Sequence, residues 1–205
     1  MKGLVIFVHP RRDSFCGGLL DSVLNGLTAA GHEVQVADLY AEGFNPAFTA
    51  EDFAQFSDQP MPPDVLREQA RFDWCEGVVI ISPIWWYQFP AMLKGWIDRV
   101  FSEGWAFEGS HSERKVNPIG WRKLLVIASA GSNPRTFDKY GYSVGIKALW
   151  DTGVWGYCGF VDRHTEFFWN VQPKSQTDAE RAAYMARAFE LGVGFAGLSS
   201  RNPQN

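Results

Sequence analysis

The sequence predicts an α/β fold in which a doubly wound sheet of five parallel strands, ordered 2-1-3-4-5, lies between two layers of helices. Three continuous apolar runs, at residues 4–8, 78–81 and 124–128, support this prediction. Runs without alternation are typical of strands covered on both faces, as in the centre of a parallel sheet. Helical patterns separate these runs, so strand and helix alternate along the chain, as right-handed crossovers require.

Two further segments have the character of edge strands. Residues 34–39 are interrupted by polar side chains, and residues 160–171 begin and end apolar but carry charged residues between. Polar and charged side chains are typical of strands at the edge of a sheet. With 34–39 at one edge and 4–8 in the centre, the natural strand order is 2-1-3-4-5.

Four helices are predicted around these strands. The apolar positions of residues 16–27 share one helical face, and Gly31 supplies a stop. Residues 93–101 repeat the i, i+3, i+4, i+7 spacing of an amphipathic helix. A third helix covers about 142–152, and the last opens at Thr177 with a capping-box pattern.

Two long loops interrupt the alternation of strand and helix. Residues 40–63 are rich in proline and predict a surface excursion with a short helix near 49–56, and residues 104–121 form the second loop. Loops of this length are usually functional or take part in oligomer contacts. The whole chain, 1–205, is expected to be one domain with a mobile tail at about 198–205.

The composition narrows the function classes. The net charge is −4 and the 19 basic residues are scattered, which argues against a nucleic-acid partner. Three cysteines without a C-x-x-C pair argue against a zinc site and a disulfide framework, and favour a reducing compartment. No apolar run approaches the ~20 residues that cross a bilayer, and no signal-peptide pattern opens the chain. We therefore expect a cytoplasmic protein with neither a metal site nor an integral membrane segment.

The first candidate for chemistry is the loop after the first strand, residues 9–15. It runs into a helix, whose free N–H groups and positive dipole end attract anions. Ser14 adds a hydroxyl, and Arg11 and Arg12 could neutralise phosphate charge. The alternative is that Asp13 or Ser14 is an ordinary helix cap and the arginines are solvated. The loop lacks the G-x-x-x-x-G-K pattern of a Walker P-loop.

Two other loops should meet the first one, because ligands of such sheets bind beyond the carboxyl ends of the strands. After the third strand an aromatic run is held between two prolines, and it offers an apolar wall and backbone donors for a planar heterocycle. After the fourth strand the small residues Ser129, Ala130 and Gly131 allow backbone to approach a ligand closely.

One glycine motif is rejected as a nucleotide site. Residues 192–197 match G-x-G-x-x-G by spacing, but they follow a predicted helix rather than a strand and precede no βαβ unit.

Motifs spread over about residues 3–170 share a common resemblance. They are His9-Pro10 with Ser14-Phe15, Asp38-Leu39-Tyr40, Phe44-Asn45-Pro46, Pro83-Ile84-Trp85-Trp86, Phe89-Pro90-Ala91 with Leu93-Lys94-Gly95, and Cys158-Gly159-Phe160. In this order they resemble the flavodoxin-like NAD(P)H:quinone oxidoreductases. That family includes mammalian and bacterial quinone reductases and the ancillary oxidoreductases of potassium-efflux systems.

The resemblance implies a flavin that receives hydride from NAD(P)H and passes it to a quinone or similar acceptor, in a homodimer with the site at the subunit interface. It places His9, Ser14 and Phe15 at the phosphate end, and Phe107 beside the ring in the substrate slot. The flavin ring would be lined by Pro83, Ile84, Trp85, Trp86 and Tyr87, and closed on its other edge by Ser129, Ala130 and Gly131. The two arginines beside Ser14 and the similarity to FAD-using relatives favour FAD, although one phosphate site would serve FMN equally.

The chain also departs from the family pattern. Cys16 stands where the mammalian enzymes have asparagine, and Thr136 and Tyr142 align with their proton-transferring tyrosine and histidine. Tyr140 and Tyr142 are therefore the candidate catalytic residues, with packed or surface tyrosines as the alternative. Two other functions compete with the enzyme: a regulatory subunit docked peripherally on a membrane transporter, and a flavodoxin-type electron carrier.

Overall fold

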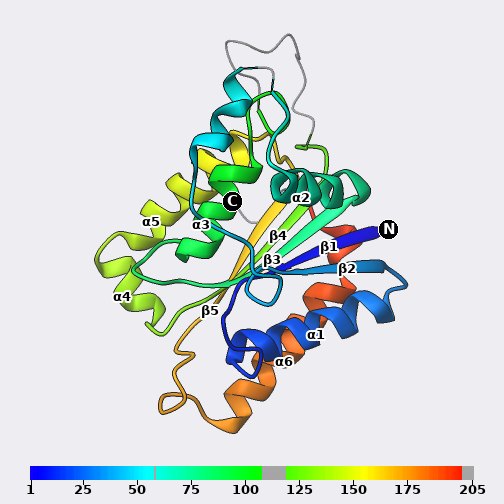
Figure 1. Cartoon of the computed structure of the whole chain (residues 1–205). Coiled ribbons are helices and arrows are strands. Elements are labelled where there is room, and N and C mark those ends of the chain that lie inside the picture. Colours follow the sequence, from blue (N-terminus) through cyan, green and yellow to red (C-terminus); the bar gives the residue numbers. More distant parts are fainter. Residues whose placement is uncertain (58, 108–118, 200–205) are drawn as a thin grey trace.

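The structure is a computed structural model that describes residues 1–57, 59–107 and 119–199. Its centre is a five-stranded parallel sheet in the order β2-β1-β3-β4-β5, which confirms the predicted fold class and order (Figure 1). Both predicted edge strands lie at the edges. The strands are β1 (Lys2–Phe7), β2 (Glu33–Asp38), β3 (Gly77–Pro83), β4 (Lys123–Ser129) and β5 (Arg163–Phe168).

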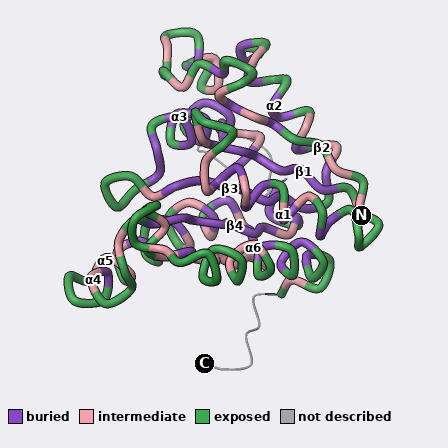
Figure 2. Tube along the Cα trace, turned by 90° about the horizontal axis from the view of Figure 1, so that it is seen from below, coloured by how far each residue is buried: buried purple, intermediate pink, exposed green. Residues whose placement is uncertain are grey.

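Helices cover both faces of the sheet, and their inner sides are buried while their outer sides are exposed (Figure 2). On one face lie α1 (Phe15–Ala29) and α6 (Asp178–Val193). On the other face lie α2 (Pro63–Trp74) and α3 (Ala91–Val100). Three consecutive elements also pack on this face: α4 (Pro134–Lys139), α5 (Tyr142–Ile146) and the π-helix η2 (Lys147–Gly156). None of the helices within the described ranges is long and apolar enough to cross a membrane.

The structure adds to the predicted helices and refines them. Helix α2 begins at the end of the predicted proline-rich excursion, where Pro63 occupies the first helical turn. The short helix predicted near 49–56 is the 3₁₀ helix η1 (Ala50–Phe56). The helix predicted at about 142–152 is α5 continued by η2. Residues 108–118 of the second predicted loop and 200–205 of the predicted tail lie outside the described residues.

A buried arginine ties the excursion after β2 to helix α3. The Arg99 guanidinium donates to both carboxylate oxygens of Asp52, at 2.9 and 3.1 Å, and to the backbone oxygen of Asn45 at 2.7 Å. It also donates to Asp64 at the start of α2, 2.5 Å away. Asp52 is 0% exposed, so its charge is compensated by Arg99 rather than by water.

The rejected glycine motif has a packing role. A Cβ on Gly192 would lie 2.5 Å from the Val23 backbone oxygen, and one on Gly26 would lie 2.2 Å from the Phe189 oxygen. Helices α1 and α6 therefore cross at a distance that only glycine permits. The motif's Phe195 packs against Gly77 at the amino end of β3, the edge opposite the carboxyl ends of the strands.

Candidate functional site

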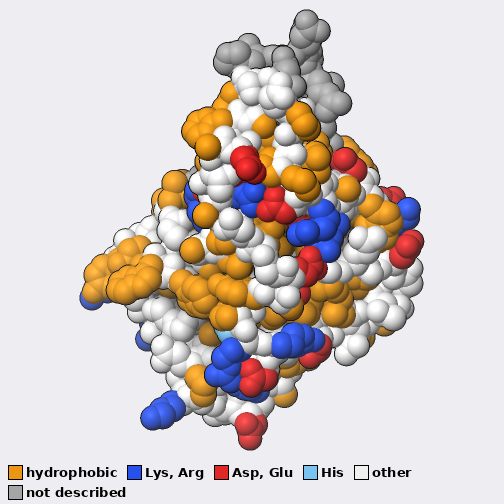
Figure 3. All heavy atoms as spheres, viewed as in Figure 1, with side chains coloured by type: hydrophobic (Ala, Val, Ile, Leu, Met, Phe, Trp, Pro, Cys, Tyr) orange, Lys and Arg blue, Asp and Glu red, His pale blue; other side chains and the backbone are white. Residues whose placement is uncertain are grey.

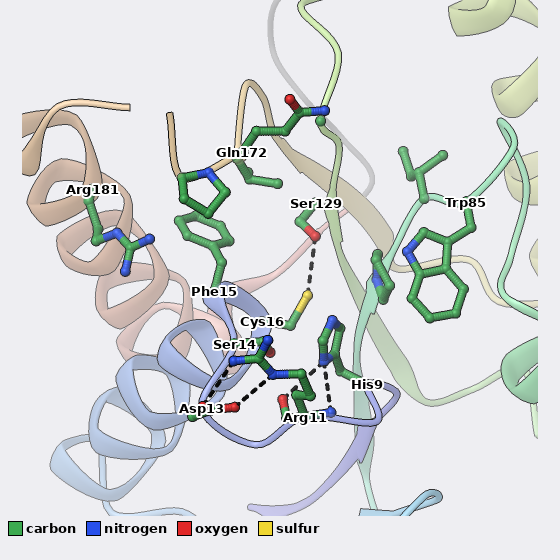
Figure 4. Close-up of a pocket in the computed structure, with 15 residues that line it drawn as sticks. His9, Arg11, Asp13, Ser14, Phe15, Cys16, Trp85, Ser129, Gln172 and Arg181 are labelled. Carbon is green, nitrogen blue, oxygen red and sulfur yellow. Dashed lines mark hydrogen bonds and ion pairs between the residues drawn. The ribbon is translucent and has the colours of Figure 1, made fainter. Parts of the chain in front are cut away.

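A cavity of about 520 Å³ opens at the carboxyl ends of the strands (Figure 4). The predicted loops after β1, β3 and β4 all contribute to its wall, as does the segment after β5, which was not predicted. The lining residues are His9, Arg11, Asp13, Ser14, Phe15, Cys16, Pro83, Ile84, Trp85, Ser129, Gly131, Val171, Gln172, Pro173 and Arg181.

One end of the cavity is the amino-terminus of α1. Ser14 is the N-cap, and its hydroxyl oxygen accepts a hydrogen bond from Gly17 N at 3.2 Å. The backbone N–H groups of Phe15 and Cys16 have no partner within the described part of the chain. Two unpaired donors at the positive end of a helix of 15 residues favour an anion. Capping by Ser14 and anion binding are thus compatible, since the Ser14 hydroxyl can still donate.

Arginines contribute unequally to this end. Arg11 lines the cavity but pairs with Asp13 at 3.0 Å, where the two side chains are 71% and 77% exposed, and this pairing lowers the pKa of Asp13. Arg12 instead pairs with Asp21 on the outer side of α1. For Arg12 the alternative prediction therefore holds, in which the arginine is a solvated surface residue. Arg181 of α6 lies over the Phe15 ring at 5.9 Å and also lines the cavity. Arg181 is thus a second cation beside Arg11 at the cavity, and the sequence analysis did not predict it.

His9 lies between the loop after β1, residues 9–15 (the phosphate loop of the prediction), and the loop after β3, residues 83–90 (the aromatic loop). Its Nδ1 lies 3.1 Å from Arg11 N and 2.9 Å from Arg11 O, so this nitrogen is engaged within the loop. Nε2 has no partner among the residues described here and remains available to a ligand. The imidazole meets the Trp85 ring edge-on, with 6.1 Å between centroids. His9 therefore stands between the anion site and the aromatic wall.

The aromatic loop contains a strained two-residue turn. Trp85 and Gln88 are paired through both backbone groups, at 3.2 and 3.1 Å, and Trp86 and Tyr87 between them have φ of 51° and 62°. The left-handed region is unfavourable for bulky side chains. Neither N–H group of the two central residues has a partner in the ranges that the structure describes. Trp86 is also 93% exposed.

A second cavity, of about 330 Å³, adjoins the first. Ile84, Gly131 and Gln172 line both. Its other walls are Trp86 and Tyr87 of the strained turn, Phe137 of α4, and Ala130 and Ser132 after β4. One hollow thus extends from the helix terminus to the aromatic turn, and it includes every predicted flavin-contacting residue: His9, Arg11, Ser14, Phe15, Pro83, Ile84, Trp85, Trp86, Tyr87, Ser129, Ala130 and Gly131.

The two candidate catalytic tyrosines lie beside the strained turn. Tyr142 stacks on Tyr87, with centroids 3.9 Å apart and an angle of 29°, and Tyr140 lies 5.8 Å from Tyr142. Desolvation raises the pKa of the Tyr142 phenol, with further contributions from Tyr87 and Tyr140. A phenol is protonated at neutral pH already at its ordinary pKa and a raised pKa makes it a weaker acid, so the case for Tyr142 as a proton donor rests on its position beside the turn.

Cys16 lies at the floor of the cavity. Its sulfur is 3.1 Å from the Ser129 hydroxyl, which joins the start of α1 to the end of β4. Burial raises the pKa of the Cys16 thiol to about 11. Since the thiolate is the nucleophilic form, this thiol is unreactive at neutral pH and its role is to pack and to connect.

Three predicted site residues do not line this hollow: Tyr140 and Tyr142 lie beside it, and Phe107 lies elsewhere. It lines a separate apolar cavity of about 390 Å³ with Phe48, Phe101, Tyr157 and Cys158. Apolar side chains also gather on the outer surface around α4 and α5 (Figure 3). Phe107 therefore does not line the hollow of its own chain.

Comparison with known proteins agrees with these features. A family model described as the flavodoxin-like fold matches residues 1–191. A protein of Escherichia coli named as an uncharacterized NAD(P)H oxidoreductase is 30% identical, covering 82% of this chain and 83% of that protein. A ribosyldihydronicotinamide dehydrogenase-like protein of Penicillium crustosum is 36% identical over 64% of this chain, which spans only 58% of the fungal protein.

A solved structure extends the comparison to the whole described fold. The NAD(P)H:quinone oxidoreductase from Methanothermobacter marburgensis is 28% identical, with a TM-score of 0.85, and the match covers 96% of this chain and 97% of that one. The chain therefore belongs to the flavodoxin-like fold family, and its relatives include NAD(P)H oxidoreductases and quinone reductases.

Proposed function

We propose that this protein is a flavin-dependent NAD(P)H oxidoreductase that passes hydride through the flavin to a quinone or a similar electrophile. The observation that carries the proposal is one continuous hollow with unpaired N–H donors at both ends. Phe15 and Cys16 offer donors for phosphate, and Trp86 and Tyr87 offer donors for the edge of a planar ring. A bound flavin supplies hydride-transfer chemistry that amino-acid side chains do not offer. The named relatives support the same activity.

FAD is the proposed flavin. FMN has one phosphate, which the amino-terminus of α1 can satisfy. Two cations line the same cavity: Arg181, and Arg11, whose exposed pair with Asp13 a second phosphate would have to replace. A second phosphate and an additional ring would use these cations and the wall formed by Val171, Gln172 and Pro173.

Chromatography of the extracted cofactor tests this proposal directly. The purified protein should be yellow, release FAD on denaturation, and lose its visible absorbance anaerobically on addition of NADPH or NADH. A colourless protein that takes up neither FAD nor FMN would contradict the flavin assignment. Bleaching that no quinone reverses would instead favour the regulatory alternative. Release of FMN would overturn only the choice of FAD.

Tyr142 is the proposed proton donor to the acceptor. Tyr142→Phe should leave bleaching by NAD(P)H unchanged and slow the quinone-dependent return of colour by about 100-fold, because positioned proton donors contribute on this scale. Stopped-flow absorbance separates the two half-reactions. Tyr140→Phe removes a neighbouring hydroxyl from a side chain that is 59% exposed and serves as the comparison. If both variants carried out both half-reactions at wild-type rates, the two tyrosines would be packing residues without a catalytic role.

A homodimer is proposed to complete the substrate slot. Phe107 and the apolar cavity that it lines lie away from the hollow of their own chain, so they could serve the hollow of a second copy. Light scattering should give twice the mass of one chain, and Phe107→Ala should raise the KM for the quinone. A monomeric mass with unimpaired quinone turnover would contradict this arrangement.

A further inference from the structure

One segment of the chain holds three successive residues of the aromatic loop. Tyr87 stacks on Tyr142 of α5 with centroids 3.9 Å apart. Gln88 accepts a hydrogen bond from Trp150 Nε1 of η2 at 3.3 Å, and Phe89 stacks on the Trp150 ring with centroids 4.1 Å apart and an angle of 20°. The α5–η2 segment thus contacts the loop on consecutive side chains, directly after the strained residue Trp86.

The strain at Trp86 and Tyr87 requires an external restraint. Two consecutive aromatic residues at positive φ do not adopt this turn spontaneously, because turns of this kind favour glycine and asparagine. The backbone pairing of Trp85 with Gln88 closes the turn, and both bonds are at least 3.1 Å long. The contacts of Gln88 and Phe89 with Trp150 fix the outgoing arm of the turn.

Trp150 is well suited to act as that restraint. It is only 2% exposed, so its ring cannot move without disturbing the core, whereas the turn itself lies at the surface. The π-helical geometry of η2 directs both Trp150 and Trp155 into the core. Short π-helical segments are rare and concentrate at functional sites, because their extra residue per turn is tolerated only where it is useful.

We propose that Trp150 is a positioning residue that holds the Trp85–Gln88 turn, whose central residues Trp86 and Tyr87 line the hollow, in its left-handed conformation. Trp150 does not itself line the hollow, so it acts through Gln88 and Phe89. The role of the N–H groups of Trp86 and Tyr87 as flavin donors rests on the proposed function. The control of the turn by Trp150 does not.

The chain offers a matched control for the indole. Trp150 and Trp155 are both buried in η2, but Trp155 Nε1 has no hydrogen-bond partner within the residues described. Trp150→Phe and Trp155→Phe remove the same atoms from the same helix. Only the first removes a hydrogen bond to the turn, since Trp155 contacts Phe89 through its ring alone, with centroids 5.6 Å apart, and phenylalanine keeps a ring at that place.

The first measurement is made without any flavin. In ¹⁵N-labelled apoprotein, Trp150→Phe should shift the backbone amide resonances of Trp86 and Tyr87 and change their three-bond coupling from the value of the left-handed region. Phe89→Leu, which removes the stacking partner from the turn, should do the same, and Trp155→Phe should not. An unchanged turn in both Trp150→Phe and Phe89→Leu, with the fold intact by circular dichroism, overturns the proposal.

The second measurement titrates FAD into the same apoproteins. Trp150→Phe should weaken FAD binding about tenfold, equivalent to about 1.4 kcal/mol, while Trp155→Phe should change it less than about twofold. An altered turn with unchanged FAD affinity would overturn the link between Trp150 and the ligand. If the wild-type apoprotein binds no FAD, the proposed function fails, and the amide measurement still decides whether Trp150 controls the turn.

Discussion

Arg99→Leu should lower the free energy of unfolding by about 3–5 kcal/mol, because removing one partner leaves a buried charge without compensation. Asp52 is fully buried and receives two hydrogen bonds from Arg99. The substitution would also remove the hydrogen-bond donor that Asp64 and the Asn45 backbone oxygen share. Urea denaturation followed by fluorescence gives the change directly, since the midpoint should fall at constant slope.

The matched control lies on the same helix. Lys94 and Asp98 form an exposed pair one turn apart on α3, and such pairs contribute about 0–1 kcal/mol. Lys94→Leu should therefore leave the unfolding midpoint nearly unchanged. Adding Asp52→Leu to Arg99→Leu should recover part of the loss, because the uncompensated carboxylate is then gone. Equal effects of Arg99→Leu and Lys94→Leu would show that the buried network does not anchor the excursion.

Gly17→Ala should weaken flavin binding by about 10- to 100-fold, the range that corresponds to about 1–3 kcal/mol of overpacking. A Cβ at this position would lie 1.8 Å from the Arg12 backbone oxygen, so the phosphate loop must move outward. The movement would displace Ser14 from the cap that it forms with Gly17 N. Fluorescence titration of the apoprotein with flavin measures the effect.

The neighbouring glycine provides the control. A Cβ on Gly18 would meet only the flexible end of Met185, 3.2 Å from its sulfur. Gly18→Ala should therefore bind flavin normally and gain stability, because alanine is favoured over glycine inside a helix by about 1 kcal/mol. If Gly17→Ala and Gly18→Ala bound flavin with equal affinity, the loop of residues 9–15 would not take part in flavin binding.

The sheet could be predicted from the sequence because its centre depends on local pattern. Strands covered on both faces need continuous apolar runs, and three such runs coincide with β1, β3 and β4. Helix α2 was missed because its inner face is partly polar. Glu68 and Gln69 are buried there, and they are satisfied by Trp96 and by the Val100 backbone oxygen, contacts that α2 makes only after it packs on α3.

The meeting of the three loops at one cavity was predictable for the same reason. Loops after central strands must meet at one edge of the sheet, so the three loops could be named in advance. Arg181 and Gln172 reach the cavity only because the chain returns after β5, and no local pattern signals that return. The different positions of Arg11 and Arg12 depend on which carboxylate each one pairs with, which sequence spacing alone does not specify.

The hydrogen bond between Cys16 and Ser129 joins residues 113 positions apart in the sequence. The floor of the hollow therefore cannot assemble until β3 has docked beside β1 and β4 beside β3, after more than half of a nascent chain has been made. A ligand that needs this floor has no affinity for partly folded forms. Its binding energy is added to the stability of the complete native state, so, with the flavin of the proposed function as this ligand, flavin supply would set how long the protein survives proteolysis.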